Sequence, residues 1–187
     1  MKINRCDWCE GDDLYEAYHD KEWGVPVKDD ATLFEFLILE TFQAGLSWIT
    51  VLKKRENFKK AFDGFDYKKI ARYDQNKIID LLNDAGIIRN KLKVNATVSN
   101  AKAFMKVQSE FRSFSNYYWG FVNNTPIKNR VENYREAPAK TPLSDLLSKD
   151  LKKRGFKFVG STVLYAMMQA TGMVNDHEIS CFRYEEV

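Results

Sequence analysis

The stretch LETFQAGLSWITVLKKRENF, from Leu39 to Phe58, sets an acid and a large aromatic residue ahead of a basic run. It continues the apolar run LFEFLIL, opens with Glu40 and turns basic after Trp48. On a helix, the residues at positions i−4, i−3 and i+4 share the face of residue i. For Glu40 all three are apolar: Phe36, Leu37 and Ala44. The pattern indicates an acid that faces the core, and a solvated surface glutamate is the alternative.

Length and composition fit one globular domain. The chain has 187 residues, 44% of them hydrophobic, and a net charge of +3. A chain of this size buries roughly 70% of its unfolded surface, and a polyanion could bind only where basic residues gather on one face. The start, MKINRCDWCEGDD, lacks a signal-peptide core, and no apolar run of about 18 residues occurs. We therefore expect a cytoplasmic protein without a membrane span, whose three cysteines stay reduced.

Apolar spacing and capping residues predict an all-helical protein. Capping residues precede several of the expected segments, and Gly45, Gly155 and Gly172 follow three of them. The expected helices cover residues 33–44, 48–62, 75–84, 142–154 and 162–170. The best strand candidate is FKFV, residues 156–159. Residues 122–141 hold two of the four prolines and few apolar residues, so we expect a long surface connection there.

The two ends of the chain hold every histidine and cysteine. Cys6 and Cys9 form CDWC, His19 follows, and His177 and Cys181 form HEISC. On a helix the latter spacing would put both side chains on one face. Zinc prefers four thiolate or imidazole ligands in a tetrahedron, so a metal tying the two ends is one interpretation. Ordinary buried residues are the alternative, and spacing does not choose between the first two cysteines.

The segment IIDLLNDAGIIRNKLK predicts two helices joined by a turn at Gly86, where glycine would permit a left-handed backbone or a close approach. The second helix should begin near Arg89, with Lys91 and Lys93 in its first turns, and free amides at a helix start bind anions. The arrangement resembles a helix-hairpin-helix that grips the DNA backbone, and a plain helix pair is the alternative. Basic runs at 52–60 and 149–158 suggest one cationic surface, with salt-dependent binding.

Five motifs together resemble the 3-methyladenine DNA glycosylase I family, and they span nearly the whole chain. They are YEAYHDKEWGVP, QAGLSWITVLKKRENF, DAGIIRNKLK, LKKRGFKFVGST and GMVNDH. The resemblance implies an all-α helix-hairpin-helix DNA glycosylase fold in a single domain over residues 1–187. The hairpin would lie at about 76–106, and zinc-binding terminal segments would cover 1–23 and 174–187. The implied activity is hydrolysis of the N-glycosidic bond of N3-methyladenine in alkylated DNA, which leaves an abasic site.

The resemblance also implies site residues. The ligands of one structural Zn²⁺ would be Cys6, His19, His177 and Cys181, which makes Cys9 a spare thiol. The pocket for the flipped base would hold the catalytic residue Glu40 with Trp48, Tyr18, Trp23 and Trp8. Apart from the resemblance, the Gly45 turn should expose Leu46, which we expect to wedge into the gap left by the flipped nucleotide. From the expected hairpin we also predict DNA contacts at Gly86, Arg89 and Lys91.

These residue types suit a cationic base. N3-methyladenine in DNA carries a positive charge and leaves as a neutral base, so selection of the damaged base matters more than acid catalysis. An indole face attracts such a cation by roughly 0.5–2 kcal/mol, and we expect the base to stack on Trp48 with Tyr18 opposite. A carboxylate at Glu40 can accept hydrogen bonds and offset the charge. Which of base reading, water activation or sugar-cation stabilisation it performs stays open.

Departures from the family pattern keep alternatives open. Thr41 and Phe42 stand where smaller or more polar residues are expected, so the wall next to Glu40 could admit a wider range of alkylated purines. From Arg89 to Ser109 there is no acidic residue, as in the resembling family, so Glu110 is not assigned a catalytic role. A non-catalytic zinc-stabilised module that binds damaged DNA is a further alternative. We expect a monofunctional, monomeric enzyme without lyase activity, with double-stranded alkylated DNA as partner and free 3-methyladenine as product.

Overall fold

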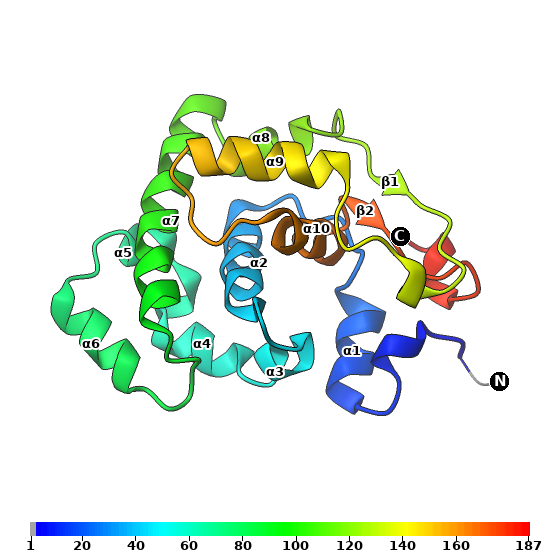
Figure 1. The fold of residues 1–187 in the computed structure, drawn as a ribbon, viewed down its shortest axis with the longest axis horizontal. Helices are drawn as coiled ribbons and strands as arrows, with labels where there is room; N and C mark the ends of the chain where they lie inside the picture. The colour runs from blue at the N-terminus through cyan, green and yellow to red at the C-terminus, as the bar shows by residue number, and fades with distance from the viewer. Residues whose placement is uncertain (1–2) are drawn as a thin grey trace.

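Helix α2 (Asp30–Gln43) runs through the middle of the molecule, and other helices pack around it (Figure 1). The computed structural model describes residues 3–187. Nine residues of α2 between Leu33 and Phe42 are buried, and Glu40 is one of them. The remaining helices are α1 (Asp13–Lys21), α3 (Trp48–Leu52), α4 (Arg55–Ala61), α5 (Tyr67–Ile70), α6 (Gln75–Asn83), α7 (Lys91–Phe111), α8 (Phe114–Gly120), α9 (Pro142–Lys153) and α10 (Ser161–Ala170). The sequence predicted an all-helical protein, and the structure is mostly helical.

Two short strands add a minor element. β1 (Ile127–Lys128) and β2 (Val174–Asn175) pair in parallel, with Ile127 opposite Val174. Four 3₁₀ turns complete the described elements: η1 (Asp7–Cys9), η2 (Asp63–Phe65), η3 (Tyr134–Glu136) and η4 (Phe182–Glu185). Within residues 3–187, the helices are all too short or too polar to cross a bilayer.

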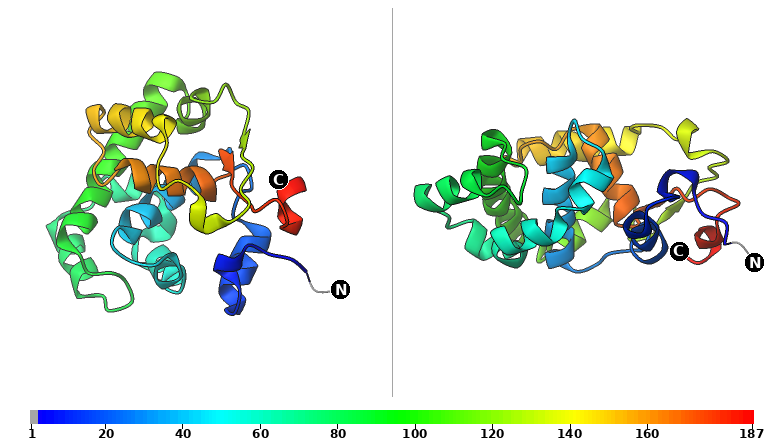
Figure 2. Two further views of the ribbon diagram at one scale, coloured as in Figure 1. Left: turned by 45° about the vertical axis from the view of Figure 1, so that its right-hand side comes forward. Right: turned by 90° about the horizontal axis from the view of Figure 1, so that it is seen from below.

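Both ends of the chain lie on the same side of the molecule, away from α6 and α7 (Figures 1 and 2). The Phe182 N–H donates to the Asn4 carbonyl at 3.0 Å, and the Asn4 side chain donates to the Ser180 carbonyl at 2.6 Å. The β1–β2 pair adjoins this contact through β2. The fold therefore brings residues from opposite ends of the sequence into one small region.

Three of the predicted helix starts are confirmed by their capping bonds, whereas Ser47 precedes α3 without a side-chain cap. Asp29 accepts from the Thr32 N–H at the start of α2, and Asp74 accepts from the Lys77 N–H at the start of α6. Thr141 begins α9 with a capping box, followed by a proline at the first helical position. Each cap satisfies backbone donors that a helix start leaves free.

The prediction of one helix over residues 48–62 is wrong, because the chain turns at Lys53 and Lys54 between α3 and α4. The Lys54 N–H donates to the Val51 carbonyl, a three-residue spacing that tightens and ends α3. After this turn Phe58 packs its ring 4.7 Å from that of Phe42, centroid to centroid. The break lets α3 pack against α2 and places Phe58 of α4 against Phe42 near the carboxyl end of α2.

The strand predicted at 156–159 is also wrong. Phe158 has φ +57, which a strand does not accommodate, and side chains rather than a neighbouring strand satisfy the backbone. Ser148 donates to the Val159 carbonyl at 2.6 Å, and Asn100 bonds both backbone groups of Lys157. The segment is a loop between α9 and α10. The long connection predicted at 122–141 is confirmed, although it contributes β1 and η3.

Candidate active site and metal centre

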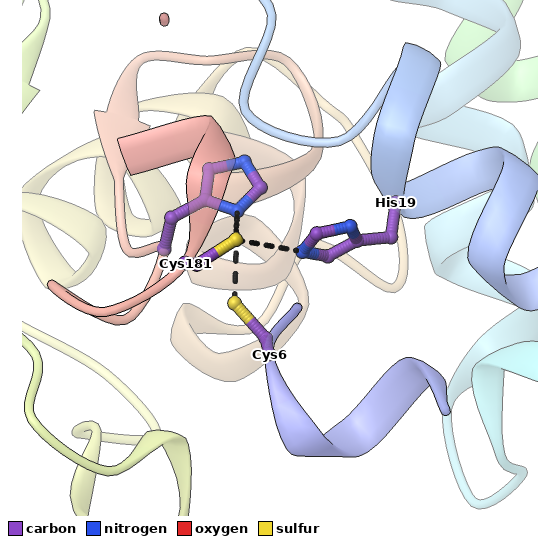
Figure 3. A group of neighbouring side chains, drawn as sticks. Cys6, His19 and Cys181 are labelled. Carbon is purple, nitrogen blue, oxygen red and sulfur yellow. Dashed lines mark hydrogen bonds between the residues drawn. The ribbon is translucent and has the colours of Figure 1, made fainter. Parts of the chain in front are cut away.

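Four buried side chains from both ends of the chain meet in one cluster: Cys6, His19, His177 and Cys181. Figure 3 labels Cys6, His19 and Cys181 of this cluster. Their possible ligand atoms all lie within 4.8 Å of one another. The Cys181 Sγ lies 3.4 Å from His19 Nε2 and 3.6 Å from His177 Nδ1, and Cys6 Sγ lies 3.6 Å from His177 Nδ1. These four groups could hold one metal ion.

The elements around the cluster explain this convergence. Cys6 precedes η1, and His19 lies on α1. His177 and Cys181 follow β2 in a turn, so the prediction that a helix aligns them is wrong. Gly24 lies against the cluster with φ +80, and a Cβ there would come within 2.8 Å of His177 Nε2, so only glycine fits.

Each histidine has its other ring nitrogen held by an acceptor. His19 Nδ1 lies 2.8 Å from Asp20 Oδ1, and His177 Nε2 lies 3.1 Å from the Trp23 carbonyl. Arg5 in turn holds the Asp20 carboxylate at 2.8 Å. Such outer partners orient imidazole ligands in metal sites.

The hydrogen bond between the two thiols of the cluster raises the pKa of Cys6 and lowers the pKa of Cys181, which favours a thiolate at Cys181. The thiolate is the form that binds metals. Cys9 is buried nearby, and its thiol donates to the Cys6 carbonyl at 3.2 Å instead of joining the four.

Beside this cluster lies a cavity of about 300 Å³ that is lined mainly by aromatic side chains. α1 contributes Tyr18, α2 contributes Glu40, and the start of α3 contributes Trp48. The complete lining is Trp8, Tyr15, Tyr18, Trp23, Glu40, Gln43, Ser47, Trp48, Tyr134, Ala166 and Gln169. All five residues predicted for the base pocket therefore line this cavity.

Glu40 is 3% exposed, and its Oε2 has no hydrogen-bond partner among the described residues. Burial alone raises the pKa of this carboxyl to about 8. The indole N–H groups of Trp8 and Trp48 are likewise buried without partners. Buried polar groups are rarely left unpaired, so one orphan acceptor and two orphan donors around a cavity point to a polar ligand.

The aromatic rings that line the cavity also pack against one another. Tyr18 and Trp48 contact each other, with centroids 5.4 Å apart and planes tilted by 47°. At that separation no base fits between them, so stacking on Trp48 with Tyr18 opposite requires one ring to move. Trp8 and Trp23 pack edge to face at 5.0 Å, and Trp23 also contacts the His177 ring at 4.6 Å. The same indoles thus separate the cavity from the Cys/His cluster.

The two departures beside Glu40 do not alter the cavity. Thr41 is buried and its hydroxyl donates to the Ile38 carbonyl at 2.7 Å. Phe42 is also buried and packs on Phe58. Neither residue lines the cavity, so the expected change in the wall next to Glu40 is wrong. Both side chains point into the protein core, although they directly follow Glu40 on α2.

Sequence reasoning missed six lining residues: Tyr15, Gln43, Ser47, Tyr134, Ala166 and Gln169. Helical spacing could have found two of them, since Tyr15 lies three residues before Tyr18, and Gln43 lies three residues after Glu40. Ser47 adjoins Trp48 in the chain. Nothing local points to Tyr134 or to the two residues of α10.

The residues predicted to contact DNA lie apart from the cavity or at its edge. Leu46 is 42% exposed and follows Gly45, which has φ +85. Arg89 and Lys91 are exposed near the start of α7, in the predicted hairpin of α6 and α7. Lys93 is instead buried and donates to the carbonyls of Phe42 and Ala44 at 2.9 and 2.8 Å.

Two expectations about the α6–α7 turn are corrected. Gly86 does not have a left-handed backbone, but its position is tight, since a Cβ there would approach the Asp84 carboxylate to 2.9 Å and the Asn57 side chain to 3.3 Å. The first amides of α7 are not all free, because Asn90 accepts from two of them. By contrast, α10 starts at Gly160 without a side-chain cap.

Comparisons with known proteins agree with one another. A family model described as methyladenine glycosylase matches residues 8–184. The chain is 49% identical over 182 residues to DNA-3-methyladenine glycosylase 1 of Escherichia coli (strain K12), which covers 97% of each chain. A crystal structure of 3-methyladenine DNA glycosylase I matches with a TM-score of 0.93 and 50% identity, over 96% of this chain and 98% of that one. A structure concerning 3-methyladenine recognition by the Staphylococcus aureus enzyme has a TM-score of 0.93 and 34% identity, over 97% of each chain.

Proposed function

This chain belongs to the methyladenine glycosylase family, and we propose that it excises N3-methyladenine from alkylated DNA by hydrolysing the N-glycosidic bond. The product would be free 3-methyladenine and an abasic site. The observation that carries the proposal is Glu40, a buried carboxyl without a partner in an aromatic cavity of about 300 Å³. Such a cavity suits a single flipped base.

Charge supplies the selection. A methylated adenine in DNA is a cation, and its charge favours the ionised form of Glu40, which burial otherwise disfavours. Ordinary adenine brings no charge, so it would meet either a protonated acid or an uncompensated buried anion. The face of Trp48 adds roughly 0.5–2 kcal/mol for a cation. The pocket therefore prefers the damaged base by its charge and does not depend on the sequence of the flanking bases.

Hydrogen-bond partners in the cavity suit an aminopurine. Adenine presents an exocyclic amine as donor beside ring nitrogens as acceptors. Glu40 Oε2 offers the acceptor, and the indole N–H groups of Trp8 and Trp48 offer donors. We infer that Glu40 binds the base and stabilises its charge. The base leaves neutral, so no acid is needed to protonate it.

We propose that the Cys/His cluster binds one structural Zn²⁺ through Cys6, His19, His177 and Cys181. A tetrahedral zinc with Zn–S near 2.3 Å and Zn–N near 2.0–2.1 Å holds sulfur and nitrogen about 3.5 Å apart. The three measured S···N separations are 3.4, 3.6 and 3.6 Å. A closed set of four protein ligands leaves no position for water or substrate, so the ion would tie the two ends of the chain together and take no part in the reaction.

We propose that DNA binds to the protein surface around the opening of the cavity. Leu46, exposed after the Gly45 turn, would fill the gap left by the flipped base. Gly86, Arg89 and Lys91 would contact phosphates as a helix-hairpin-helix. The uncapped start of α10 in the α9–α10 hairpin offers a second set of free amides. Because one chain supplies the whole cavity lining, we propose that the enzyme acts as a monomer.

Release of bases from methylated DNA tests the proposed function. The wild-type enzyme is expected to release 3-methyladenine and to leave the strand intact, since no lysine is placed as a nucleophile in the cavity. Glu40→Gln should lower kcat/KM by about 100-fold, because a charged hydrogen bond to the cation is lost. A module that only binds damaged DNA would release no base in either form, and that outcome would overturn the proposal.

A further inference from the structure

Gln169 lies on the cavity wall, one helix away from Glu40. It is the penultimate residue of α10, which packs along α2 in the middle of the molecule (Figure 1). Its side chain lines the same cavity as Glu40 and is 6% exposed. A buried amide at a ligand cavity acts as an acceptor if its carbonyl oxygen faces the cavity, and as a donor if its NH₂ group does.

Asp176 fixes the orientation of this amide. The Asp176 carboxylate accepts from Asn129 Nδ2 at 2.6 Å, from the Tyr165 hydroxyl at 2.7 Å and from Gln169 Nε2 at 2.8 Å. Gln169 turns its NH₂ group towards Asp176, whose carboxylate oxygen accepts from it. Since Asp176 is 1% exposed and held by three donors, the amide cannot flip without leaving a buried acceptor short of a partner.

The carbonyl oxygen of Gln169 therefore lies on the other side, towards Tyr134. The Tyr134 hydroxyl donates to Gln169 Oε1 at 3.4 Å, which is long for such a bond. A carbonyl oxygen has two lone pairs, so Oε1 can accept a second donor without losing this contact. Tyr134 and Gln169 both line the cavity, hence the free acceptor capacity is at its wall.

We propose that Gln169 is a specificity-determining residue that accepts a hydrogen bond from the exocyclic amine of a methylated adenine. Methylated guanine carries O6 at that position, an acceptor that would face the Gln169 carbonyl without a proton between them. Glu40 selects for positive charge, which methylated adenine and guanine share, and Gln169 adds a second acceptor that favours the amine of adenine over O6 of guanine. This inference rests on the proposed function and extends it to the choice between the two purines.

The test is the pattern of bases released by Gln169→Met, which keeps the length of the side chain and removes its carbonyl. The substrate is duplex DNA methylated to contain N3-methyladenine, N3-methylguanine and N7-methylguanine. We expect kcat/KM for 3-methyladenine to fall roughly tenfold, the loss of one hydrogen bond to a charged group. Release of methylguanines relative to 3-methyladenine should rise by at least that factor, because a repulsive contact is also lost.

Gln108→Met is the matched control. Gln108 is also a partly buried amide that donates to an aspartate, Asp30, at 2.6 Å, but it lies on α7 and does not line the cavity. Its substitution should leave the ratio of released bases unchanged. A ratio shifted equally in both variants, or unchanged in Gln169→Met, would overturn the role of Gln169.

The two proposals fail in different ways. A wild-type enzyme that releases no 3-methyladenine overturns the proposed function, whereas normal wild-type release with an unaltered Gln169→Met ratio overturns only this inference. If the variant does not fold, a crystal structure of the wild-type protein with 3-methyladenine decides the question. Gln169 Oε1 must then lie within about 3.2 Å of the exocyclic nitrogen, and a longer separation contradicts the proposal.

Discussion

The Cys/His cluster and the neighbouring cavity are both buried and polar, yet they treat their polar groups in opposite ways. In the cluster every ligand group has a partner, either another cluster residue or an outer acceptor such as Asp20. In the cavity Glu40, Trp8 and Trp48 each keep a buried polar atom that has no partner within residues 3–187. The polar groups of the cluster pair with one another and could together hold one metal ion. The polar groups of the cavity are left available for a ligand that enters from outside.

This contrast indicates where stability and function are located. Satisfied buried groups hold the chain together, and unsatisfied ones lower stability until a ligand arrives. The two regions share a wall, since Trp23 contacts both the cavity and the His177 ring. The cluster can thus support the rigid side of the cavity without touching the base.

The largest expected effect comes from breaking the cluster. Cys181→Ser removes one of four ligands and leaves buried groups unpaired, so we expect loss of bound zinc and a free energy of unfolding lower by roughly 3–5 kcal/mol. Thermal unfolding and metal content measure this. Cys9→Ser is the control, because Cys9 is a buried thiol outside the four; it should keep its zinc and lose about 1 kcal/mol or less. Equal losses in both variants would contradict a metal role.

The pH dependence of activity tests the cavity acid. If ionised Glu40 binds the cation, kcat/KM on alkylated DNA should rise about tenfold per pH unit below a pKa of about 8 and level off above it. Glu40→Gln should remove this rise. Initial rates between about pH 6 and 9 at low substrate concentration provide the measurement. A wild-type profile that falls with pH would mean that the protonated acid is the active form.

The same acid should cost stability, in contrast to the cluster. Burial raises the Glu40 pKa from 4.5 to about 8, so the folded state keeps a proton that the unfolded chain has lost. Stability therefore falls as pH rises from 4.5 and becomes constant above about 8, by about 1.4 kcal/mol per pKa unit. Glu40→Gln escapes this loss, although its own amide stays buried. We expect it to be more stable at pH 8 by roughly 1–3 kcal/mol, and denaturant unfolding at about pH 5 and 8 measures the difference.

The smallest expected effect concerns the rim of the cavity. Leu46→Ala should weaken binding to damaged duplex by about three- to tenfold, because the wedge no longer fills the gap beside the flipped base. Its melting temperature should stay nearly constant, since Leu46 is 42% exposed. Leu146→Ala, at 55% exposure on α9, is the control and should bind as the wild type does. Unchanged affinity and excision in Leu46→Ala would remove this residue from the wedge role.

Features set by nearest neighbours were predictable from the sequence. The caps at Asp29, Asp74 and Thr141 follow from a hydroxyl or carboxylate placed before a helical pattern, and the structure confirms them. Burial of Glu40 followed from the apolar residues on its helical face. The four cluster residues came from their scarcity and from the family resemblance, not from local geometry, since HEISC is a turn.

The predictions from the sequence failed where contacts between residues far apart in the chain determine the local structure. The helix expected over 48–62 breaks so that α3 and α4 can pack against α2. The strand expected at 156–159 is a loop because Ser148 and Asn100 satisfy its backbone. Tyr134 and Gln169 reach the cavity from segments whose sequences give no sign of it.

By itself, the sequence determined the helical class, the helix starts and the chemical groups available for a cationic base, because these depend on periodicity and on residue type within a few positions. Only the tertiary structure decided which groups lack a partner, which way the Gln169 amide faces and how the two chain ends meet. Those outcomes depend on contacts between residues far apart in the chain, where burial removes water as an alternative hydrogen-bond partner. The energy of each polar group is then fixed by the particular neighbours that folding gives it.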